Sequence, residues 1–109
     1  MANSTTEKSL LHKFCPYEKS NNHLRKSIEQ AFRFVLPRQR CIKKMSQYEF
    51  SKKCGFSRQY ISLIESGKRM PKLEFVFNFA DGFDMKIQDF MRLLVEKVVY
   101  YEELDRAST

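Results

Sequence analysis

The chain has 109 residues, 42% of them hydrophobic, and a formal net charge of +7, which suits one compact domain with a small core. No apolar run approaches the ~18 residues of a transmembrane helix, and the polar N-terminus lacks a secretory signal, so no membrane partner is expected. Cys15, Cys41 and Cys54 are odd in number and widely spaced, which favours a reducing cytoplasm over a disulfide framework or a zinc site.

Charge is distributed unevenly along the chain. Residues 1–74 carry 16 Lys and Arg against 6 Asp and Glu, whereas residues 75–109 carry 4 against 7. A basic majority followed by an acidic end favours one surface for a polyanion such as nucleic acid and another for something else. On charge alone, a solvated cationic surface that serves solubility remains an equal alternative.

The first third of the chain divides into an arm and a helix. Residues 1–22 are rich in Ser, Thr, Asn and Lys and show no period, so we expect a flexible polar arm. Apolar residues at helical spacing then predict a helix over about 24–43. Pro37 lies inside that pattern and lacks a backbone donor, so a kink or break is expected near Leu36.

A helix over 47–54 is marked at both ends. Ser46 followed by Glu49 is a capping-box pattern, in which the hydroxyl accepts from the third amide and the carboxylate reaches back. Gly55 can adopt the positive φ that ends such a helix.

A second short helix, over 58–66, follows at once. Ser57 is a favoured N-cap residue, and Gly67 ends the pattern. Two short helices joined by a turn that contains Gly55 are the layout of a helix-turn-helix. No metal-binding or catalytic cluster and no phosphate-binding glycine loop accompanies them, so neither a cofactor nor an enzymatic function is predicted.

Two more helices complete the pattern, over 73–83 and 87–104, so we expect an all-α fold with about five helices in one domain. The last helix is apolar on nearly all sides, which is normal only for a buried helix. We therefore expect residues 91–109 to extend the domain as a dimerisation element. The residues expected in that homodimer interface are Leu94, Val95, Val98, Val99 and Tyr101.

The run M-S-Q-Y-E-F-S-K-K-C-G-F-S-R-Q-Y-I-S-L-I-E-S-G-K-R-M-P-K-L, residues 45–73, resembles the lambda-repressor-like helix-turn-helix family of the Cro and xenobiotic-response-element type. The resemblance implies a DNA-binding domain over residues 23–90, with the recognition helix 57–66 in the major groove. It also implies a two-fold dimer on a pseudo-palindromic operator of double-stranded DNA. The family usually has Ala and Gly where this chain has Gly82 and Asp84, so an altered turn is expected there, with Gly82 costing roughly 1 kcal/mol relative to Ala.

Roles for single residues follow from this resemblance and from side-chain chemistry. The resemblance directs Arg58, Gln59 and Leu63 at base edges, and the short side chain of Ser62 shares their face. It also implies an ion pair between Arg40 and Glu65. The expected phosphate contacts are Gln47, Ser57, Tyr60, Lys43, Lys44, Lys68 and Arg69.

Two functions remain open on the sequence. The first is a sequence-specific transcriptional regulator, as a dimeric repressor or a controller protein. The second is an antitoxin or coactivator-like module that binds a protein partner, such as a toxin or a polymerase, with DNA binding secondary.

Overall fold

The computed structural model describes residues 22–107, and the polar arm expected over 1–22 lies outside them except for Asn22. The expected all-α fold is confirmed, because the described residues form five helices and no strand. No helix in this range is long and apolar enough to span a bilayer. The helices are α2 (Asn22–Ile42), α3 (Gln47–Cys54), α4 (Arg58–Glu65), α5 (Leu73–Gly82) and α6 (Ile87–Ala107).

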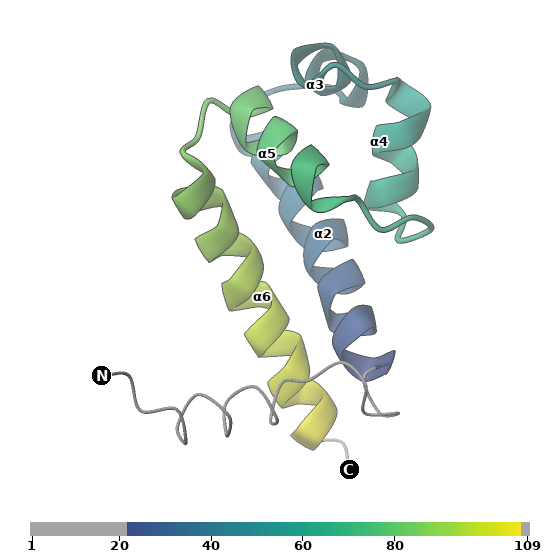
Figure 1. The fold of residues 1–109 in the computed structure, drawn as a ribbon, viewed down its shortest axis with the longest axis vertical. Helices are drawn as coiled ribbons and strands as arrows, with labels where there is room; N and C mark the ends of the chain where they lie inside the picture. The colour runs from purple at the N-terminus through teal and green to yellow at the C-terminus, as the bar shows by residue number, and fades with distance from the viewer. Residues whose placement is uncertain (1–21, 108–109) are drawn as a thin grey trace, which may run out of the picture.

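The two long helices, α2 and α6, lie side by side and run in opposite directions (Figure 1). A polar clip joins the first two turns of α2 to the C-terminal part of α6. The carboxylate of Glu102 accepts a 2.7 Å hydrogen bond from Ser27 Oγ and lies 3.0 Å from Nδ1 of His23. The short helices α3, α4 and α5 gather at the opposite end of the pair (Figure 1).

The proline inside α2 does not break it. The helix is continuous from Asn22 to Ile42, so of the kink or break expected near Leu36, the break is wrong. Pro37 offers no N–H to the preceding turn. Val35 and Leu36 are only 4% and 0% exposed, however, and their burial holds the helix in place on the proline's N-terminal side.

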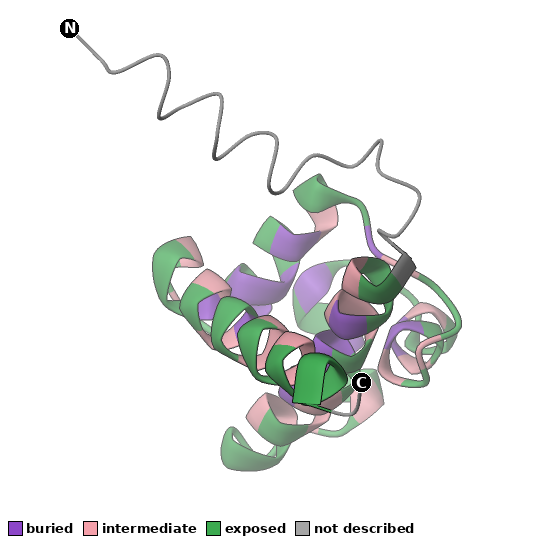
Figure 2. Ribbon diagram, turned by 90° about the horizontal axis from the view of Figure 1, so that it is seen from below, coloured by how far each residue is buried: buried purple, intermediate pink, exposed green. Residues whose placement is uncertain are grey.

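Aromatic rings fill the core where the short helices meet the long pair. Phe50 of α3 stacks on Phe83 with a centroid distance of 4.1 Å and on Phe79 at 6.0 Å. Phe90 of α6 lies 5.8 Å from Phe83, and all four rings have no exposed surface. The buried positions accordingly face inward on every helix (Figure 2).

Gly82 ends α5 where α5 approaches α3 closely. A Cβ added at Gly82 would lie 2.6 Å from Sγ of Cys54 and 3.0 Å from Cε1 of Phe50. The helix-propensity cost expected for Gly82 is therefore opposed by a steric constraint, because alanine does not fit without displacing core atoms. The turn that follows contains Asp84 at a left-handed φ of 56°.

Candidate nucleic-acid interface

Capping hydrogen bonds at the ends of α3 and α4 stabilise the helix-turn-helix. At the start of α3, Ser46 Oγ accepts from the amide of Glu49 at 3.0 Å, and the Glu49 carboxylate accepts from the amide of Ser46 at 2.8 Å. The hydrogen bond from the Ser46 amide to the Glu49 carboxylate, with a smaller contribution from the Ser46 side chain, lowers the pKa of Glu49. Gly55 ends α3 at a φ of 82°, and Ser57 Oγ accepts from the amide of Tyr60 at 3.1 Å. The capping pattern expected from the sequence is present in full.

The second helix, α4, has one buried and one exposed face. Ile61 and Ile64 are fully buried against the core. Arg58 and Gln59 are exposed at the start of the helix, and Leu63 is 36% exposed one turn later. Ser62 is half-buried, so of the four expected base contacts it is the one with the least access to a ligand.

A nearly buried ion pair joins α4 to α2. The guanidinium of Arg40 donates to both carboxylate oxygens of Glu65, at 2.6 and 2.8 Å, and to the carbonyl of Met45 at 3.0 Å. The Glu65 side chain is 7% exposed. The hydrogen bond to Glu65 raises the pKa of Arg40, although partial burial opposes it. The carboxylate on α4 is thus neutralised from within the protein, as the resemblance implies.

Two successive hydrogen bonds, which we call the relay, connect the Glu65 carboxylate to the exposed face of α4. Gln47 Nε2 donates to Oε1 of Glu65 at 2.9 Å, and Arg58 Nη1 donates to Oε1 of Gln47 at 3.3 Å. Sequence reasoning missed this relay, because no local signal links positions 18 apart. The Gln47 side chain therefore positions Arg58, in addition to any phosphate contact that it makes.

Four exposed cations lie in the turns next to the helix-turn-helix. Lys43 and Lys44 lie in the turn before α3, and Lys68 and Arg69 follow α4. Tyr60 is different, because its ring is half-buried between Phe56 and Phe75, with centroid distances of 4.9 and 5.8 Å. Burial raises the pKa of Tyr60, and the positive charge of Arg69 partly offsets this effect.

Three further residues border this surface and were not singled out from the sequence. Tyr48 and Lys52 of α3 line a hollow with Ser57, Arg58 and Gln59, and Lys52 Nζ lies 5.3 Å from the centre of the Tyr48 ring. Their spacing of four on an exposed helix face was the available signal. Arg33 of α2 lies against Gly67, because a Cβ added there would be 2.6 Å from its Cδ.

The residues expected at a dimer interface differ in exposure and fall into three groups. Leu94 is 5% exposed and belongs to the core of the single chain, so its assignment to an interface is wrong. Val98 and Tyr101 are half-buried. Val95 and Val99 are 51% and 48% exposed, so they remain available to a partner.

Comparisons with known proteins fit this geometry. A helix-turn-helix family model matches residues 38–90. An uncharacterised HTH-type transcriptional regulator of Methanocaldococcus jannaschii is 42% identical over 50 residues, which are 46% of this chain and 76% of that protein.

Solved structures share the fold. The restriction-modification controller protein C.Esp1396I superposes with a TM-score of 0.62 and 23% identity over 67% of this chain and 95% of its own. Its tetramer, solved in complex with a natural 35-base-pair operator, gives a TM-score of 0.61 at 24% identity over 66% and 95%. The clp gene regulator ClgR of Corynebacterium glutamicum gives 0.62 at 16% identity over 78% and 86%.

Proposed function

This chain belongs to the Cro-type helix-turn-helix family of transcriptional regulators, and we propose that it regulates transcription by sequence-specific binding to double-stranded operator DNA. In this proposal α4 lies in the major groove and α3 crosses the DNA backbone. No step of the proposed function is catalytic.

The observation that carries the proposal is the exposed start of α4. Arg58 is a cation at a helix N-terminus, where the helix dipole disfavours it. The relay from Glu65 through Gln47 nevertheless holds its guanidinium at the surface, and Gln59, the next residue, is also exposed. A guanidinium held in this way can donate to O6 and N7 of guanine, and an amide can pair with N6 and N7 of adenine.

Phosphate contacts are assigned to the groups around that face. Lys43 and Lys44 in the turn before α3, and Lys68 and Arg69 after α4, are exposed and carry four positive charges. The N-terminus of α3, beginning at Gln47, adds backbone N–H groups that favour an anion. Ser57 and the hydroxyl of Tyr60 complete the assigned set. Such contacts position the protein without reading sequence.

The proposal includes a homodimer, because operators of this kind have two half-sites about one helical turn apart. Val95 and Val99 supply the exposed apolar surface for it on α6, bordered by the half-buried Val98 and Tyr101. Light scattering at micromolar concentration should give the mass of two chains. The mass of one chain, both free and on DNA, would contradict the dimer.

Selection from a pool of random duplexes tests the function itself. We expect the purified protein to enrich a pseudo-palindromic sequence and to protect two half-sites in a footprint. Enrichment without any shared sequence, or no binding at low ionic strength, would overturn the proposal and would favour the protein-partner alternative.

A further inference from the structure

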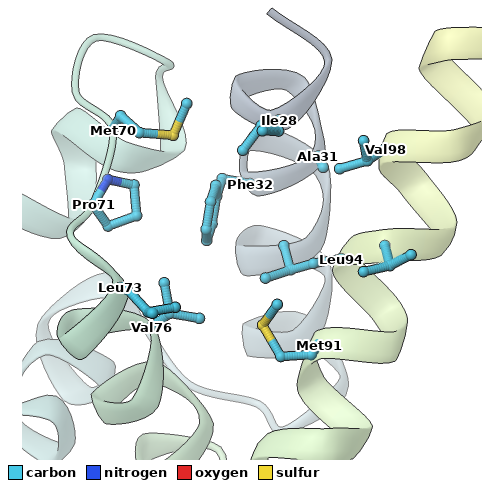
Figure 3. Close-up of a pocket in the computed structure, with 11 residues that line it drawn as sticks. Ile28, Ala31, Phe32, Met70, Pro71, Leu73, Val76, Met91, Leu94 and Val98 are labelled. Carbon is cyan, nitrogen blue, oxygen red and sulfur yellow. The ribbon is translucent and has the colours of Figure 1, made fainter. Parts of the chain in front are cut away.

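An apolar groove opens between the long helix pair and the start of α5. Its volume is about 350 Å³, and Phe32 of α2 lies between the side chains of α5 and those of α6 (Figure 3). Every residue that lines it is apolar, and Leu73 and Val95 at its edge are 67% and 51% exposed. The lining includes Ile28, Phe32, Pro71, Val76, Leu94 and Val98.

The groove is built mainly by parts of the chain that flank the matched family domain. The family model covers residues 38–90, whereas Ile28, Phe32, Leu94 and Val98 all lie outside that range. It exists because α2 begins well before the matched domain and α6 continues well beyond it. The groove therefore lies largely outside the residues that the family model matches.

The chemistry of the lining selects its occupant. Small-molecule sites usually combine an apolar wall with a few polar groups that orient the ligand. This groove offers no such group, since its lining has no hydroxyl, amide or charged side chain. It therefore suits a peptide segment that buries several apolar side chains at once.

We propose that residues 10–17 of the same chain occupy the apolar groove. This stretch reads Leu-Leu-His-Lys-Phe-Cys-Pro-Tyr, with four large apolar or aromatic residues in eight positions. It is the main apolar cluster in the 21 residues before α2, which are otherwise largely polar.

The point of attachment brings this segment to the groove. The chain enters the structure at Asn22, and Ile28 on the groove wall lies about 9 Å farther along the same helix. The residues between Tyr17 and Asn22 can span up to ~17 Å, so the segment can turn back over Ile28. Ser20 and Asn21 are residue types that favour such a reversal.

Tethering and charge both favour this segment as the occupant. A covalent tether of this length gives the segment an effective concentration in the millimolar range at the groove. Residues 8–19 carry three lysines and one glutamate, whereas residues 96–105 of α6 carry four acidic residues and one lysine. Approach of the segment along α6 therefore pairs opposite charges.

Disulfide trapping in the full chain tests the proposal, because Cys15 lies inside the segment. Cys41 is exposed and is first replaced by Ser. Cys54 can stay, because burial raises its pKa to about 12 and leaves little reactive thiolate. A partner cysteine is then introduced as Val95→Cys at the groove edge or, as the control, as Tyr100→Cys.

The two positions are matched in exposure, at 51% for Val95 and 50% for Tyr100. Tyr100 lies nearer on α6 to Glu102, which contacts the start of α2, so an undocked segment would reach it first. We expect the bond within one chain to form at least about tenfold faster in Val95→Cys, as measured by non-reducing electrophoresis and peptide mass mapping. Adding Phe14→Asp should lower that rate to the level of the control.

Three results would overturn the proposal. Equal rates at the two positions would show that the segment does not choose the groove. A Val95→Cys rate that Phe14→Asp leaves unchanged would show proximity without docking. A bond that forms mainly between the Val95→Cys positions of two chains would show that Val95 faces a second copy, as in the proposed homodimer, and not the segment; it would overturn docking of the segment and leave the DNA-binding proposal untouched.

Discussion

The two ends of this molecule are stabilised in different ways. The helix-turn-helix end consists of two eight-residue helices that depend on caps, a buried ion pair and a side-chain relay. The other end consists of two 21-residue helices joined along apolar faces, with one polar clip at their tips. Short helices have little apolar surface of their own, so hydrogen bonds must set their positions. A surface that reads DNA needs that positional accuracy, whereas a helix pair that serves as a support does not.

The variant with the largest expected effect on stability is Arg40→Met, which removes the positive charge and keeps the apolar part of the side chain. The Glu65 carboxylate would remain nearly buried without its partner, so we expect a loss of about 3–5 kcal/mol in the free energy of unfolding. Urea denaturation measures it. The matched variant is Arg25→Met, whose 3.6 Å pair with Glu29 is exposed at 66% on the arginine side. Its loss should stay below ~0.5 kcal/mol, and similar losses in both variants would erase the contrast.

Gly82→Ala tests the junction between the two ends. The new methyl group would press on Sγ of Cys54 and the ring of Phe50, so we expect destabilisation of about 1–3 kcal/mol despite the better helix propensity of alanine. Thermal unfolding would record it. Combining it with Cys54→Ala removes one of the two clashing atoms, so the double variant should lose less than the sum of the single losses. Strict additivity would mean that the close approach is not the cause.

Arg58→Ala sharpens the functional side of the comparison. If its guanidinium reads a base, binding to the selected operator should weaken by about 1–3 kcal/mol, with relaxed preference at one base position. Fluorescence anisotropy on the operator and on single-base variants measures both effects. Arg92 is also exposed but belongs to α6, outside the helix-turn-helix, so Arg92→Ala is the control and should leave binding unchanged. Equal loss on operator and random DNA would remove the base-reading role of Arg58.

Lys68→Ala addresses the phosphate contacts, which should have a smaller and less specific effect. We expect weaker binding to all duplexes and a salt slope that is flatter by about one unit. Titrations at several salt concentrations provide the slope. Lys86→Ala, in the exposed turn before α6, serves as the charge-matched control. An unchanged slope for Lys68→Ala would place that lysine off the DNA backbone.

The smallest expected effect concerns the clip at the tip of the helix pair. Burial alone would raise the pKa of Glu102, but the hydrogen bonds from Ser27 and His23 outweigh it and lower the pKa below its ordinary 4.5. A carboxylate with a lowered pKa stabilises the fold above about pH 4.5 and loses that contribution as pH falls through the folded value. Glu102→Gln should therefore be less stable than the native chain at neutral pH, with the gap closing in acid. Glu103→Gln, exposed beside it, should show no such trend in unfolding curves across pH.

Much of the helix-turn-helix was predictable because its signals are local. Ser46, Glu49, Gly55 and Ser57 act on amides within about one turn, so their spacing alone places the ends of α3 and α4. Apolar spacing likewise predicted all five helices to within a few residues. The assignment of single residues to bases and phosphates remains a prediction.

Other features depended on which helices approach each other, and no local pattern contains that information. Pro37 is tolerated because Val35 and Leu36 are buried, and Gly82 is required because Cys54 and Phe50 stand against it. A helical stripe such as that of α6 shows which side chains share a face but not how widely a neighbour covers it. That coverage places Leu94 in the core and leaves Val95 exposed. Local sequence determined the helices and their ends through interactions between near neighbours, whereas packing between distant segments decided burial, steric room and the relay that positions Arg58.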